Sequence, residues 1–229
     1  MDSQIDRWQS CLLQGDKFGL NLTRISAVTP SLLANASQHY VTDGVRAVWG
    51  SHLQCMYYLL NTSFEHALIM EDDFKILNFK KLESYLQNPR VLTYDLVQFG
   101  YLKPGLDTRV KIFIANMETR IFRFISLISG FPILSSRKFC ARLRVREAKE
   151  LPWGFTADDF QPGAHCYLVS REMAKAVIKL NNPQFLCIDD FFTAFSQMRS
   201  FKSMRSRKSL VAQAPFAKWE GDRFLKTLQ

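Results

Sequence analysis

Apolar residues recur along the chain with two different periods, which predicts helices alternating with strands. Helical spacing, with apolar residues three or four positions apart, occurs in five segments: residues 2–18, 43–63, 79–86, 171–180 and 187–198. Four shorter apolar runs are typical of buried strands: residues 23–28, 67–70, 94–100 and 163–170. This alternation predicts an α/β fold, a sheet with helices packed on it.

Two segments interrupt this pattern. Residues 101–160 mix aromatic and basic residues with several glycines and prolines, and a long irregular stretch in a compact protein is more often a functional loop than filler. Residues 199–229 form a basic C-terminal tail. We therefore expect one domain over residues 1–229, with a variable basic insertion at 101–160 and a tail after it.

Size and charge narrow the class of protein. The 229 residues carry a net charge of +9 and contain no run of about 18 apolar residues, and the N-terminus resembles no secretion signal, so we expect a cytoplasmic protein. Residues 101–150 hold 11 Lys and Arg against 4 Asp and Glu, and residues 199–208 add 5 basic residues. Such segments attract phosphates, nucleic acid or the anionic inner face of a membrane. The 5 cysteines form no CxxC pair and are expected to be small buried apolar residues.

Three acidic residues follow the apolar run at 67–70. Glu71, Asp72 and Asp73 would emerge where a buried strand meets solvent, which is where ligands bind in open α/β sheets. Carboxylates crowded in this way suit a divalent cation or a metal-bound phosphate, although an acidic turn that caps the next element is the alternative. Strand alternation predicts that Asp72 points away from its neighbours, towards backbone or a basic group.

Three further motifs accompany this acidic cluster. They are Gly50-Ser51-His52 at a helix, Gly163-x-His165-x-Tyr167 followed by Ser170, and Ile188-Asp189-Asp190 at the start of another helix. In this order and at this spacing, the four motifs resemble glycosyltransferase family 25, which includes lipopolysaccharide-type and procollagen galactosyltransferases. The resemblance covers residues 7 to about 195.

The resemblance implies a fold and a reaction. It implies a GT-A-like, Rossmann-type domain that binds a nucleotide sugar through a mixed sheet with helices on both faces. The activity implied is the inverting transfer of a hexose, with galactose favoured, from a UDP-sugar to a glycan or a lipid-linked, lipopolysaccharide-type oligosaccharide. Mn²⁺ or Mg²⁺ would neutralise the diphosphate leaving group.

The resemblance also assigns roles to residues. Asp73 and Glu71 would hold the metal, with Glu71 also facing the donor. Other donor or nucleotide contacts would come from Arg7, Gly50, Ser51, His52 and His165. An inverting reaction needs one carboxylate to accept the proton of the acceptor hydroxyl. Asp189 is the first candidate and Asp190 the second, and the pair Asp158 and Asp159 is the rival.

The N-terminus departs from the family pattern. Arg7 aligns with a family arginine, but the strand that should precede it is missing, so the first strand is either absent or encoded upstream of Met1. Two alternatives follow: an inactive relic that binds a nucleotide sugar, or a basic, metal-dependent nucleic-acid-binding protein. The basic residues of the insertion are interrupted by Gly130 and Pro132, so we expect no specific nucleic-acid recognition.

Overall fold

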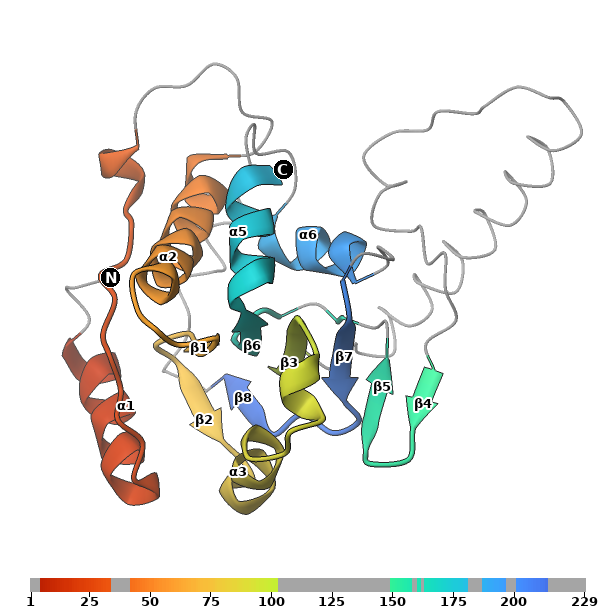
Figure 1. Ribbon diagram of the computed structural model, residues 1–229. Helices are drawn as coiled ribbons and strands as arrows, with labels where there is room; N and C mark the ends of the chain where they lie inside the picture. Colours follow the sequence, from red (N-terminus) through yellow and green to blue (C-terminus); the bar gives the residue numbers. More distant parts are fainter. Residues whose placement is uncertain are drawn as a thin grey trace, which may run out of the picture.

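The chain folds into a mixed sheet with helices, shown in Figure 1. The computed structural model describes residues 5–33, 42–102, 149–157, 160–161, 163–180, 187–196 and 201–213. The strands are β1 His66–Met70, β2 Phe74–Ile76, β3 Leu96–Gly100, β4 Lys149–Leu151, β5 Phe155–Ala157, β6 Cys166–Ser170, β7 Ser203–Ser206 and β8 Val211–Gln213.

Five α-helices and two short 3₁₀ helices are present in the described ranges. They are α1 Ile5–Phe18, α2 Asp43–Leu60, α3 Phe79–Leu86, α5 Arg171–Leu180, α6 Ile188–Phe195, η1 Pro30–Leu32 and η2 Val91–Thr93. None of the described helices combines the length and apolarity needed to cross a membrane.

The sheet has eight strands and combines both pairing directions. Its main path is β1-β6-β3-β7-β5-β4, with β8 paired to β2 and to β3. Strands β1 and β3 both lie antiparallel to β6, whereas β3 and β7 are parallel. Within the described residues, β1 pairs only with β6 and forms one edge of the sheet.

Side chains of β6 alternate between two apolar cores, one on each face of the sheet. Tyr167 and Val169 belong to a core that includes residues of α2, α5 and α6. Cys166 and Leu168 point the other way, into or against a core that includes residues of α1 and α3. Helices therefore cover both faces (Figure 1), and the predicted α/β fold with a mixed sheet is confirmed.

Polar contacts at the β6–α5 junction fix the position of α2. Ser170 Oγ accepts the backbone N–H of Met173 in the first turn of α5, as an N-cap does. The guanidinium of Arg171 donates to the carbonyls of Leu59, Leu60, Thr62 and Phe64 at the end of α2. Carbonyls in the last turn of a helix lack i+4 partners, so the cation stabilises the end of α2 and the residues that follow it beside β1.

Three sequence-based expectations differ from the structure. Residues 23–28 are not a strand, because the backbone N–H of Val28 bonds to Ser51 Oγ on α2 instead of a neighbouring strand. The predicted tail from residue 199 is wrong for β7 and β8, where three of the four residues of β7 are buried in the sheet. The predicted irregular insertion includes the hairpin β4–β5, and its residues 103–148 lie outside the described ranges.

Candidate functional site

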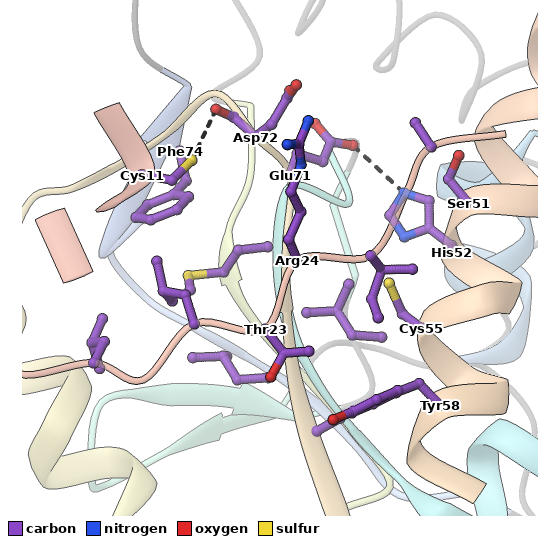
Figure 2. A pocket seen from close by; sticks show the side chains of 18 of the residues that line it. Cys11, Thr23, Arg24, Ser51, His52, Cys55, Tyr58, Glu71, Asp72 and Phe74 are labelled. Carbon is purple, nitrogen blue, oxygen red and sulfur yellow. Dashed lines mark hydrogen bonds and ion pairs between the residues drawn. The ribbon is translucent and has the colours of Figure 1, made fainter. Parts of the chain in front are cut away.

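The acidic cluster forms the turn between β1 and β2, at the rim of a cavity. The cavity measures about 780 Å³ and lies along β1, between α2 and the extended residues 20–27. Figure 2 shows this arrangement, with Glu71 and Asp72 at one end and Tyr58 of α2 towards the other. A cavity of this size falls within the range of ligand-binding pockets, roughly 300–1,000 Å³.

Glu71 faces a buried histidine and tyrosine. Its Oε1 lies 3.7 Å from His52 Nε2, and His52 Nδ1 lies 2.8 Å from the hydroxyl of Tyr167. Burial raises the pKa of Glu71, but the contact with His52 and the charges of His52 and His165 outweigh it, so the net pKa is lowered. Glu71 is therefore negatively charged at neutral pH, as a cation ligand must be.

Asp73 is buried and incompletely bonded. The residue is 4% exposed, and its Oδ1 has no hydrogen-bond partner among the described residues. Burial, followed by the negative charge of Glu71, raises the pKa of Asp73 to about 6, while Arg7 acts in the opposite direction. A buried carboxylate oxygen without a partner is costly unless a ligand or cation completes it.

Asp72 makes different contacts from its two neighbours. Its Oδ1 lies 3.0 Å from Arg7 Nη1 on α1, and its carbonyl accepts a hydrogen bond from Cys11 Sγ. The prediction that Asp72 points towards a basic group is thus confirmed. Arg7, expected to contact the nucleotide, lines the cavity and is engaged with Asp72.

The Gly50-Ser51 step brings residues 20–28 close to α2. A Cβ at Gly50 would lie 3.0 Å from Val28 Cγ2, so glycine permits the close approach. Ser51 Oγ accepts from Val28 N–H and donates to the Ala47 carbonyl. Ser51 also lines the cavity. Gly50 and Ser51 therefore pack residues 20–28 against α2, in addition to the contact with the nucleotide sugar that the sequence predicts for them.

Arg24 is a cation of the cavity that sequence reasoning missed. It lines the cavity together with Arg7, and its guanidinium lies 5.3 Å from the ring centroid of Trp8. Arg24 lies in a segment without helix or strand, so the spacing of apolar residues gives no indication of where its side chain points. Two guanidinium groups and an acidic turn around one cavity suit an anion bound together with a cation.

Two carboxylates are available for a metal ion. Among the described residues, no group of three or more His, Cys, Asp or Glu side chains is arranged to hold a metal. Mg²⁺ and Mn²⁺ that act on nucleotides need fewer protein ligands, because one or two carboxylates suffice when phosphates and water complete the shell. The unpartnered Oδ1 of Asp73 and the charged Glu71 fit this smaller requirement.

Asp189, the first candidate for the general base, bonds to backbone. Its Oδ2 and Oδ1 accept the N–H groups of Gly163 and Ala164 at 2.9 and 2.8 Å. Burial raises the pKa of Asp189, and these two hydrogen bonds oppose that effect. Neither Asp189 nor the half-buried Asp190 is among the residues that line the cavity.

The catalytic role of both aspartates therefore stays a prediction. The contacts of Asp189 give it a structural task at the Gly163 turn. The rival pair, Asp158 and Asp159, lies outside the described residues.

His165 lies on the other side of Glu71. Its carbonyl accepts the N–H of Glu71 at 3.1 Å, and the residue lines a second cavity, of about 440 Å³. Burial lowers the pKa of His165, whereas the charge of Glu71 and the Val211 carbonyl act in the opposite direction. The His165 ring and the Glu71 carboxylate thus interact electrostatically.

Gln213 separates the two cavities. It lines both of them, and its Nε2 lies 3.4 Å from Glu71 Oε2. Sequence reasoning missed Gln213, and no signal could have found it, since it follows Glu71 by 142 positions and stands in no motif. The structure therefore brings together most of the predicted donor residues but keeps the predicted base apart from them.

No protein-family model matches the chain, and no curated protein is significantly similar to it.

Proposed function

We propose that this protein is an inverting glycosyltransferase that transfers a hexose, galactose in the first instance, from a UDP-sugar to a hydroxyl group of a glycan or lipid-linked oligosaccharide. The main support is the acidic turn after β1, where a charged Glu71 and the unpartnered Asp73 Oδ1 meet at the rim of a large cavity. The four motifs of the sequence and their resemblance to glycosyltransferase family 25 point to the same activity.

The acidic and the basic residues around the cavity have different roles in this proposal. Glu71 and Asp73 would hold Mn²⁺ or Mg²⁺, which supplies neutralisation of the diphosphate when bound. Arg7 and Arg24 line the same cavity and offer guanidinium groups to phosphate oxygens. His52, held by Tyr167, faces Glu71 and restrains its carboxylate.

The reaction is a single displacement. The acceptor oxygen forms a bond to the anomeric carbon while the bond from that carbon to the UDP oxygen breaks, and UDP leaves with the electron pair. The acceptor proton passes to a base, for which Asp189 and Asp190 remain the sequence-based candidates. A cytoplasmic location, with contact to an anionic membrane surface, would suit a lipid-linked acceptor.

Calorimetric titration tests the donor site. UDP and UDP-galactose are titrated into the wild type with and without Mn²⁺, and into Asp73→Asn, with Asp16→Asn as a matched control on the exposed side of α1. We expect binding that requires Mn²⁺, is lost in Asp73→Asn and is retained in Asp16→Asn. A folded wild type that binds neither nucleotide under any condition would refute the proposed function.

A further inference from the structure

Strand β1 has one edge that no described strand covers, because it pairs with β6 alone within the described ranges. Two hydrogen bonds fix which of its backbone groups face β6. The N–H of Glu71 bonds to the His165 carbonyl, and the N–H of Arg171 bonds to the Glu65 carbonyl. In an antiparallel pair every second residue faces the partner strand, and the register of β1 with β6 is unbroken. Positions 65, 67, 69 and 71 therefore bond to β6.

The residues between these positions turn their backbone N–H and C=O groups to the open edge. They are His66, Leu68 and Met70, and all three line the cavity of about 780 Å³. The extended segment 20–27 borders the same cavity through Leu22 and Ile25, which make no backbone hydrogen bond within the parts of the chain that the structure describes. Backbone groups in a folded protein are nearly always paired. A strand between these two segments would supply the missing partners.

The surroundings of this edge are apolar on both faces of the sheet. Ile69 belongs to the core on the α2 side, and Leu68 packs against the core on the α1 side. Cys55 of α2 and Trp8 of α1 line the cavity and pack against the same two cores. A strand added beside β1 would alternate its side chains between these faces. Strands that are buried on both faces are nearly continuous runs of apolar residues.

The cavity reaches solvent at large apolar side chains. Val48, Tyr58 and Phe64 line it and are 46%, 48% and 66% exposed. Exposed apolar side chains that gather at one place mark a binding surface. An acyl chain would cover them but would leave the backbone groups of β1 without partners, which is costly. An extended peptide covers the apolar side chains and also pairs with the backbone, as in β-strand addition.

We infer that the slot between β1 and residues 20–27 binds an extended apolar peptide from another polypeptide, which joins the sheet as a strand beside β1. The peptide would match the 5 residues of β1, and its N–H and C=O groups would pair with those of residues 66, 68 and 70. The inference does not depend on the proposed function. The peptide lies along β1, and the acidic turn at the end of that strand stays available to a cation and a nucleotide.

Backbone amide hydrogen exchange of the full chain, followed by nuclear magnetic resonance, tests this pairing. In the free protein the amides of Leu68 and Met70 should exchange roughly tenfold or more faster than those of Ala67 and Ile69, which bond to β6. The probe is the peptide Lys-Val-Ile-Val-Ile-Val-Lys, blocked at both ends, in which the lysines keep the apolar run soluble. At saturation it should slow exchange at Leu68 and Met70 by roughly tenfold or more.

A modified peptide and two protein variants serve as controls. The same peptide with each of its apolar residues N-methylated keeps the side chains but has no N–H groups to donate along the run. In the protein, Val48→Trp narrows the slot. Tyr57→Trp is the matched control on the same helix, since Tyr57 is 51% exposed and lines neither cavity. Fluorescence anisotropy of the labelled probe should show affinity falling by roughly tenfold or more with the N-methylated peptide and with Val48→Trp, and unchanged in Tyr57→Trp.

Three results would overturn the inference. If the amides of Leu68 and Met70 are already protected in the free full chain, a segment of this chain covers the edge and no other polypeptide is needed. If the N-methylated peptide binds as well as the probe, the cavity takes apolar material without adding a strand. If the probe leaves exchange at Leu68 and Met70 unchanged, the slot is not its site. The calorimetric experiment with UDP stands or fails independently of all three.

Discussion

Removing the charge of Asp73 should stabilise the ligand-free protein at neutral pH. The pKa of about 6 in the folded protein lies above the usual value of 3.8 for an aspartate. Below pH 3.8 the carboxyl group is protonated in both the folded and the unfolded state, so it has no effect on stability. As the pH rises to 6 only the unfolded state ionises, and stability falls until the folded state ionises as well.

The size of the expected stability change follows from the difference of about two units between the folded and the unfolded pKa of Asp73. This difference corresponds to roughly 3 kcal/mol of lost stability above pH 6. Asp73→Asn removes the titration but keeps the shape of the side chain. The variant should therefore match the wild type below about pH 3.8 and exceed its free energy of unfolding by up to about 3 kcal/mol at pH 7.5. In a chain of this size that difference raises Tm by roughly 6–12 °C.

Thermal unfolding followed by circular dichroism at about pH 3.5, 6 and 7.5 measures this difference, with Asp16→Asn as the control. Added Mn²⁺ should raise the Tm of the wild type but not that of Asp73→Asn, because only the wild type has the carboxylate that the cation would bind. A variant that is less stable than the wild type at pH 7.5 would contradict the argument, since it would mean that the Asp73 charge is stabilised by protein contacts alone.

Two further predictions concern the histidines of the two cavities. His52→Phe should lower the free energy of unfolding by about 1–3 kcal/mol, because the Tyr167 hydroxyl loses its hydrogen-bond partner at 2.8 Å. Adding Tyr167→Phe to this variant should lower the free energy of unfolding little further. If urea unfolding shows additive losses for the two substitutions, His52 and Tyr167 do not stabilise the fold as a hydrogen-bonded pair. Gly163→Ala should cost roughly 1–3 kcal/mol, because its Cβ would lie 2.8 Å from Cε1 of the His165 ring at a φ of +102°. Gly19→Ala is the matched control in the same urea measurement, since Gly19 has a φ of +64° with nothing within 4 Å, and equal losses would show that the ring contact is unimportant.

The sequence predicted those elements whose apolar pattern is local. Helices α3 and α5 agree with the expected ranges, and β1, β3 and β6 are apolar runs that face two cores. Strands β7 and β8 were missed because charged residues such as Arg205 hide their alternation, and because their partner β3 lies about a hundred residues earlier. No local signal encodes such a pairing.

The candidate site was predictable to a similar degree. The acidic turn was found because three carboxylates in a row after an apolar run are conspicuous, and His52 and His165 were found through motifs. Their separation into two cavities could not be predicted, since Gln213 between them comes from a distant strand. The hydrogen bonds from two backbone N–H groups to Asp189 could not be predicted either. An acidic residue at the start of a helix can cap that helix, bind a ligand or bond to another loop, and the sequence does not distinguish these roles.

The pairing of β3 also has a consequence for the order in which the protein can fold during synthesis. Strand β3 is complete at Gly100, but its neighbours β6, β7 and β8 end at Ser170, Ser206 and Gln213. The ribosome must therefore deliver more than a hundred further residues before the centre of the sheet can close. During that interval the apolar faces of β1 and β3 are exposed, so this chain is expected to fold slowly and to depend on chaperones until its last strand has emerged.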